Sequence, residues 1–164
     1  MFTASHKGMI LAAIADALRP AGFRKNGSKF TRNLGDVIHL ISLQSSTSST
    51  AASLQATANL AVWVPALADN EGPPDMWSSH WRERIGQLMP DRSDRWWTVT
   101  NEKEAAVAAS EIREAIQMYV LPTFAALATS AALVQLWKSG VSPGLTERQA
   151  QRYLQRLHES SRTG

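Results

Sequence analysis

The clearest pattern along the chain is a regular alternation of apolar and other residues between Leu54 and Val64. One set of alternate positions is entirely apolar and consists of Leu54, Ala56, Ala58, Leu60, Val62 and Val64. The other set is mixed and consists of Gln55, Thr57, Asn59, Ala61 and Trp63. A period of two is typical of a strand with unlike faces. We therefore predict a strand over residues 54–64 that buries its apolar set and ends at Pro65.

Two shorter strands are predicted before it, over residues 28–32 and 37–44. The residues between them include Asn33 and Gly35, which suit the positive φ of a hairpin turn. The stretch 45–53 is almost entirely Ser, Thr and Ala, a composition that predicts a mobile loop.

The region after Pro65 is harder to assign. Residues 69–75 contain a Gly-Pro-Pro sequence and are predicted to form a surface loop. A helical stripe would consist of Trp77, Trp81, Ile85 and Leu88. Residues 82–88 also suit a short strand, so we expect a helix that turns into a strand. Residues 95–100, rich in Trp, Thr and Val, predict a further strand.

Helical spacing marks both ends of the chain. Ile10, Ile14 and Leu18 recur every four residues and predict a helix over residues 5–19, capped by Ser5. Toward the other end, the sequence around 101–104 resembles a capping box.

The helix that starts at Asn101 is predicted to kink or restart at Pro122 and to continue to Gly140. Thr146 and Gln149 then open a last helix, over residues 146–159.

This order of elements predicts an α+β fold. A helix, a run of strands and then further helices favour an antiparallel sheet of about four to five strands, with the N-terminal helix and the C-terminal helices packed on one face. A length of 164 residues suits one domain, 1–164, and we expect its last helix at the periphery.

The composition excludes several kinds of site. The chain has no cysteine, so it has no disulfide, no thiolate metal ligand and no cysteine nucleophile, and a reducing cytoplasm is expected. Residues 115–137 carry no charge and could span a bilayer by length alone. The polar residues and the proline within that stretch favour a buried helix, so no membrane association is expected.

The charge is uneven along the chain. Its net value is +3, and the segment 19–32 holds five basic residues and no acid, namely Arg19, Arg24, Lys25, Lys29 and Arg32. This segment offers a weaker hypothesis of nucleic-acid contact, because nucleic-acid sites usually interleave aromatic and basic residues and here they are separate. A second basic stripe, Arg148, Arg152 and Arg156, suits a solvated helix face equally well.

The usual signatures of catalysis are missing from the sequence. Its four histidines, His6, His39, His80 and His158, lie far apart, and no glycine-rich phosphate loop or Gly-x-Ser-x-Gly elbow occurs. We therefore assign no catalytic residue, no metal ligand and no cofactor.

Several motifs occur in the order seen in one known family. They comprise Leu18, Gly22, Phe23, Gly27, Phe30 and Arg32; Gln44, Ser46 and Asn59; Arg82, Arg84, Ile85, Gly86 and Leu88; and Asp94, Trp96 and Trp97. On these residues, over about 10–136, the chain resembles the bacterial proteins grouped as domain of unknown function 4304. One spacing departs from the family pattern, because Leu88 follows Gln87 one residue early. The resemblance implies an α+β fold and no agreed substrate.

A candidate binding face follows from the predicted strands. If residues 54–64 keep their apolar set inward, Asn59 and Trp63 share the opposite face, and Gln44 could join them from the neighbouring strand. Because Trp96 and Trp97 are adjacent in a strand, they point to opposite faces, and one lies outside the main core. The predicted ligand- or partner-binding residues are Gln44, Asn59, Trp63, Arg82, Arg84 and Trp97.

Amide, guanidinium and indole groups suit binding better than bond-breaking. Our first hypothesis is a non-catalytic binding module for a protein partner or a small anionic ligand, active as a monomer or homodimer. The alternative is a small enzyme acting on an anionic substrate, in which Arg84 binds charge and His39 or His80 is the base, within about 4 Å of Arg84. An ordinary buried amide network would explain the same polar residues.

Overall fold

A computed structural model describes residues 2–69 and 71–163, with side chains for residues 6–69 and 71–160. Its helices are α1 (Phe2–Leu18), α2 (Ile85–Leu88), α3 (Glu102–Ala115), α4 (Leu121–Ala126), α5 (Ser130–Lys138) and α6 (Glu147–Thr163). Short 3₁₀ turns are η1 (Arg19–Ala21) and η2 (Pro65–Leu67), and η3 (Ile116–Val120) is a π-helical turn. The strands are β1 (Arg24–Asn26), β2 (Lys29–Asn33), β3 (Ile38–Ser45), β4 (Leu54–Trp63), β5 (Trp81–Arg84) and β6 (Trp97–Val99).

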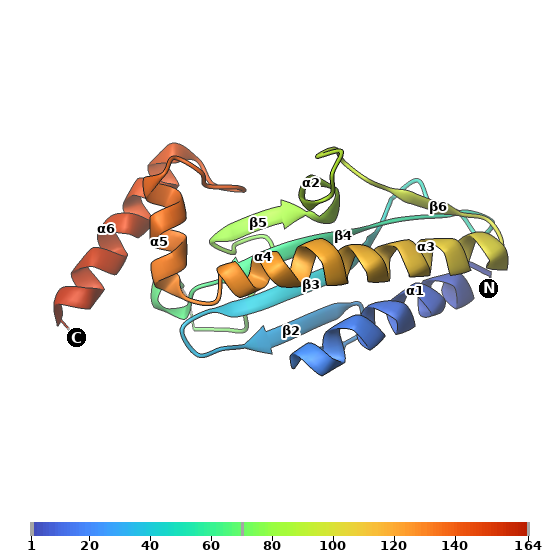
Figure 1. Cartoon of the computed structure of the whole chain (residues 1–164), viewed down its shortest axis with the longest axis horizontal. Helices are drawn as coiled ribbons and strands as arrows, with labels where there is room; N and C mark the ends of the chain where they lie inside the picture. Colours follow the sequence, from blue (N-terminus) through green and yellow to red (C-terminus); the bar gives the residue numbers. More distant parts are fainter. Residues whose placement is uncertain (1, 70, 164) are drawn as a thin grey trace.

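The strands form one antiparallel sheet in the order β1-β2-β3-β4-β5, and β6 also pairs with β4. Helices α1, α3 and α4 lie against one face of this sheet, which we call the inner face (Figure 1). The predicted α+β class, an antiparallel sheet with an N-terminal helix and C-terminal helices, is therefore confirmed.

Strand β4 has the two faces that its alternation predicts. Leu60 and Val62 are buried in the main core beneath the helices. Ala61 and Trp63 belong to a second, smaller apolar cluster on the opposite, outer face, where Met76 covers them. The outer face is therefore partly closed by the segment that follows β4.

The predicted hairpin between β2 and β3 is confirmed. The side chain of Asn33 accepts a hydrogen bond from the backbone N–H of Gly35 at 2.8 Å, and Gly35 has a φ of 86°. Strand β1 was not predicted, because its three exposed residues are polar and carry no apolar alternation.

The predicted helix running from Asn101 through Pro122 to Gly140 is wrong in its continuity. Its N-terminal cap is confirmed, since the Asn101 side chain accepts from the Glu104 N–H at 2.8 Å. The π-helical turn η3 precedes Pro122, which lies in the first turn of α4, where a missing N–H is tolerated. The helical path then breaks, and α5 leaves at 90° to the preceding segment.

New hydrogen bonds start α5 at this break. The Thr129 hydroxyl caps the helix at 3.1 Å, and the Asp36 carboxylate accepts from the Ser130 N–H at 2.6 Å. No single helix within the described residues is long and apolar enough to cross a membrane, although the segments 102–126 and 130–138 pass that test as a bent pair.

The region 81–88 has the two predicted elements in the reverse order. Strand β5 comes first because it pairs with β4, placing Arg84 opposite Asn59, and α2 follows at Ile85. Gly86 at the start of α2 allows a close approach of the next loop, since a Cβ there would lie 2.1 Å from the carbonyl oxygen of Ser93.

Helices α5 and α6 lie together at one end of the molecule, beyond the sheet (Figure 1). The predicted capping box of α6 is confirmed, because Thr146 and Gln149 exchange hydrogen bonds of 2.9 and 3.1 Å. The predicted cap at Ser5 concerns a side chain outside the described residues, and α1 already begins at Phe2. Although α6 lies at the periphery, its Tyr153 is only 6% exposed and joins the main core.

Candidate functional site

The structure divides the predicted site residues between two places. Gln44, Asn59 and Arg84 lie on the outer face of the sheet, because the register places Gln44 opposite Thr57 and Asn59 opposite Arg84. The Asn59 side-chain amide donates to the Gln44 side-chain oxygen at 2.7 Å. This pair satisfies part of the hydrogen-bonding capacity of a buried amide, as an ordinary amide network does.

Arg84 is already paired. Its guanidinium donates to the Asp94 carboxylate at 2.7 Å and lies over the Trp96 ring, 5.2 Å from the ring centroid. The Trp96 indole N–H also donates to Asp94, at 3.0 Å. Asp94 therefore neutralises the guanidinium charge of Arg84, which we predicted from the sequence to bind a ligand.

Trp97 lies on the inner face, so the structure does not bring it to the other predicted residues. It pairs with Ala56 across β6 and β4, is 4% exposed and donates from its indole N–H to Glu111 at 2.7 Å. Because adjacent strand residues point to opposite faces, Trp96 rather than Trp97 lies beside Arg84.

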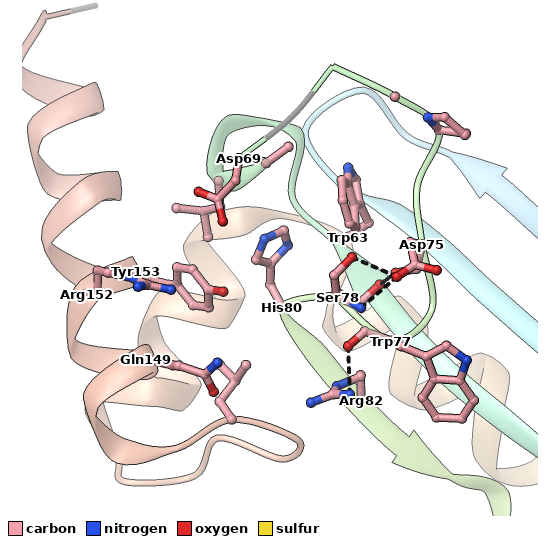
Figure 2. Close-up of a pocket in the computed structure, with 16 residues that line it drawn as sticks. Trp63, Asp69, Asp75, Trp77, Ser78, His80, Arg82, Gln149, Arg152 and Tyr153 are labelled. Carbon is pink, nitrogen blue, oxygen red and sulfur yellow. Dashed lines mark hydrogen bonds between the residues drawn. The ribbon is translucent and has the colours of Figure 1, made fainter.

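Trp63 and Arg82 line a cavity of about 410 Å³, which we call the C-terminal pocket. It lies between the ends of β4 and β5, the segments 67–69 and 72–80, and helix α6 (Figure 2). Its principal side chains are Trp63, Asp69, Asp75, Trp77, His80, Arg82, Gln149, Arg152 and Tyr153.

His80 lies at the centre of this pocket and is neutral. Its Nδ1 accepts a hydrogen bond from the Val64 N–H at 2.9 Å, so the ring proton is on Nε2. Burial lowers the pKa of His80 to about 4, and a hydrogen bond to the Leu67 backbone opposes that shift only in part. The Tyr153 ring meets His80 edge-on at 5.0 Å, and Trp63 lies 5.2 Å away on another side.

Neither arginine of the pocket has a carboxylate partner within the part of the chain that the structure describes. Arg82 donates to the backbone carbonyl of Trp77 at 2.8 Å and to that of Gly144, and its Nε is buried without an acceptor. Arg152 lies over the Tyr153 ring, 5.4 Å from its centroid.

Both aspartates of the pocket are otherwise engaged. Asp69 forms an ion pair of 3.1 Å with Arg156 of helix α6. Asp75 accepts hydrogen bonds from the Ser78 N–H and hydroxyl at 3.0 and 2.8 Å. The Ser78 donors are neutral, so Asp75 keeps its negative charge, whereas that of Asp69 is balanced by Arg156. The pocket therefore has aromatic walls and two arginines against one unbalanced carboxylate.

Sequence reasoning missed the α6 side of this pocket. Arg152 was seen only as part of a basic stripe, and Tyr153 was not named as a site residue. In the structure the three arginines of this stripe have different surroundings. Arg148 is exposed, Arg152 lines the pocket and Arg156 pairs with Asp69. A local pattern cannot distinguish these roles, because they depend on where the helix docks.

The enzyme hypothesis needs a histidine beside Arg84, and the structure places both candidates elsewhere. His80 precedes Arg84 by four residues, which is about 13 Å of extended strand. Its backbone N–H donates to the Val62 carbonyl at 3.0 Å. His39 lies on the inner face, where it stacks on Phe124 with ring centroids 4.3 Å apart.

Both nitrogens of His39 are also occupied. Arg32 donates to Nδ1 at 2.9 Å, so Nε2 carries the proton and donates to the Leu127 carbonyl at 2.8 Å. Burial lowers the pKa of His39 to about 4. Among the described residues, no cluster of three or more potential ligands could hold a metal ion.

The basic segment 19–32 does not form one surface. Arg24 and Lys25 are exposed on β1, but Arg32 turns inward to His39 and lies over the Phe23 ring at 4.7 Å. Lys29 donates to the Pro74 carbonyl at 3.4 Å.

No curated protein and no solved structure matches the chain significantly. A family model, the domain of unknown function DUF4304, matches residues 14–126. The match covers the sheet and helices α3 and α4, and it ends before α5 and α6. Because it spans more than half of the 164 residues, the chain belongs to the DUF4304 family.

Proposed function

We propose that the protein is a non-catalytic binding module that takes a carboxylate-bearing ligand with a flat apolar part into the C-terminal pocket. The observation that carries this proposal is that Arg82 and Arg152 reach the pocket without a carboxylate partner in the described chain. Guanidinium groups bind carboxylates through charge-assisted hydrogen bonds, which are stronger than those between neutral groups.

The walls of the pocket support the apolar part of the ligand. Trp63 of β4 and Tyr153 of α6 line it, and Trp77 lies at its mouth (Figure 2). A volume of about 410 Å³ suits a small organic molecule or one or two amino-acid residues. Aromatic walls with a few polar groups are typical of sites that orient such ligands.

The chemistry of His80 supports binding rather than catalysis. Its Nδ1 lone pair is occupied by the Val64 N–H, and burial keeps the ring neutral, so it has no free acceptor for a substrate proton. In this proposal the Gln44–Asn59 pair and Arg84 support the outer face of the sheet, and Asp94 balances the charge of Arg84. We propose the cytoplasm as the site of action, since a cysteine-free chain is suited to a reducing compartment.

Isothermal titration calorimetry with benzoate, phenylacetate and indole-3-acetate, each compared with its uncharged amide, tests the proposal. We expect at least one carboxylate to bind about tenfold more tightly than its amide, because loss of a charged hydrogen-bond partner costs roughly 1.5–3 kcal/mol. Arg152→Gln should remove most of this preference. Arg148→Gln is the matched control, because Arg148 is exposed one turn earlier on α6 and does not line the pocket. Equal binding of acids and amides, or no binding by any probe, would contradict the proposal.

A further inference from the structure

Trp77 lies at the mouth of the C-terminal pocket. It lines the pocket and yet is 59% exposed, more than any other large hydrophobic residue among those described. Figure 2 shows its indole pointing away from His80, at the outer side of the loop. A ligand held wholly inside the pocket would leave much of this ring in water.

The backbone that carries Trp77 is fixed on both sides. Before it, Met76 is 6% exposed and packs into the outer-face cluster, and Asp75 caps the turn through Ser78. After it, the Ser79 hydroxyl donates to the Asp75 carbonyl at 2.7 Å. Arg82 holds the carbonyl of Trp77 itself at 2.8 Å.

This arrangement lowers the cost of using Trp77 in an interface. Association normally loses free energy when mobile loops and side chains become ordered, and here the loop backbone is ordered in advance. Tryptophan and arginine are the residues most enriched among those that dominate protein–protein binding energy. The exposed indole of Trp77 stands on an ordered backbone at the mouth of a pocket that two arginines line, and this suits such an interface.

We infer that the ligand of the C-terminal pocket belongs to a partner protein, which inserts an aspartate or glutamate side chain toward Arg152 and packs an adjacent apolar residue on Trp77. This inference rests on the proposed function and adds the class of ligand. The net positive charge of the pocket favours an acid, because its two arginines lack carboxylate partners in the described chain and Asp75 is its one carboxylate without a cationic partner, since Asp69 pairs with Arg156. A ligand that also covers the exposed Trp77 indole must extend beyond the pocket, as a segment of a protein would.

Selection from a random peptide library on the whole chain tests the inference. Each peptide is displayed on phage and joined to the coat protein at its C-terminus, so that no free chain end can supply the carboxylate. We expect the selected peptides to carry Asp or Glu within two residues of a large apolar residue. A synthetic peptide with blocked termini, taken from the selection, should bind at least tenfold more weakly after Trp77→Ala, after Arg152→Gln and after its own acid is changed to the amide.

Val107→Ala is the matched control for Trp77→Ala, because Val107 is also exposed, at 52%, but lies on α3 and does not line the pocket. The melting temperature of Trp77→Ala should stay close to that of the parent, since the indole is largely in solvent. Selection without acidic residues, or peptide binding that Trp77→Ala leaves unchanged, would overturn the inference. If free carboxylates still bind through Arg152 in that case, only this inference fails; if they do not, the proposed function fails with it.

Discussion

The rings of Tyr153 in α6 and His80 meet edge-on, with 5.0 Å between their centroids. The Trp137 ring of α5 lies near the same tyrosine, with 6.0 Å between centroids. This one side chain therefore joins the C-terminal helices to the ring at the centre of the pocket. His80 is in turn bonded to the backbone that continues β4, at Val64.

Tyr153→Ala should destabilise the protein by about 3 kcal/mol, because it removes a buried aromatic ring and leaves a cavity between α5, α6 and the sheet. Urea unfolding followed by tryptophan fluorescence measures this loss. Tyr153→Phe keeps the ring and should lose under about 1 kcal/mol. An unchanged midpoint for the alanine variant would show that α6 is not held through this residue.

Stability should fall as the pH is lowered from about 6.5 to about 4. The folded protein holds His39 and His80 with pKa values of about 4, whereas the unfolded chain binds their protons near pH 6.5, so acid favours unfolding over this interval. Each histidine contributes a loss of up to about 3 kcal/mol, and the loss is complete below the folded pKa. Unfolding midpoints in urea at pH 7, 5.5 and 4.5 test this.

His80→Gln provides the comparison for that pH series. The amide can still accept from the Val64 N–H, but it does not titrate. The variant should therefore be less stable at pH 7 and show a shallower loss toward pH 4.5 than the parent. A slope equal to that of the parent would contradict the role of His80 in the pH dependence.

Gly144→Ala should loosen the segment between α5 and α6. Gly144 has a φ of 80°, and a Cβ there would lie 2.7 Å from the Cβ of Arg82. Gly140 is a matched control in the same segment, with a φ of 90° and no atom within 4 Å of a built Cβ. Both alanine variants incur the left-handed backbone cost of about 1 kcal/mol, and the greater loss in Gly144→Ala should report the contact with Arg82.

The same pair should differ in ligand binding. Gly144→Ala displaces the carbonyl that Arg82 holds, so it should change the affinity of the pocket for a carboxylate probe, whereas Gly140→Ala should not. Calorimetric titration of both variants with the same probe decides this. Equal affinities would show that the loop carbonyl does not position Arg82.

Gly86→Ala should strongly lower the stability of the fold. The added Cβ would lie 2.1 Å from the Ser93 carbonyl oxygen and 2.7 Å from the Arg95 nitrogen, which are backbone atoms that cannot rotate away. We expect a loss of at least about 3 kcal/mol, at the upper end for overpacked sites. Gly8→Ala, within α1 and with no atom within 4 Å, should instead stabilise the protein by about 0.5–1 kcal/mol.

The parts of the fold that sequence analysis predicted are those with strong local patterns. The alternation of β4 placed Asn59 and Trp63 on one face, and the turn at Gly35 and the capping box at Thr146 were found from short motifs. The break after Leu127 was missed because residues 127–130 contain no glycine or proline to mark it, and the cap at Thr129 was not recognised. The hydrogen bond from Asp36 that helps start α5 comes from a distant part of the chain.

The candidate site was only partly predictable for the same reason. Trp63 and Arg82 were named from the strand face, but the pocket exists because α5 turns by 90° and brings Arg152 and Tyr153 beside them. The choice between Trp96 and Trp97 depended on the register of β6 with β4, which no local pattern reveals.

The family match stops at residue 126, whereas one wall of the C-terminal pocket begins at Leu145. Residues outside the family match therefore form one wall of the proposed binding pocket. Membership of the family by itself does not imply this pocket, so the proposed function concerns this chain and does not extend to the family as a whole.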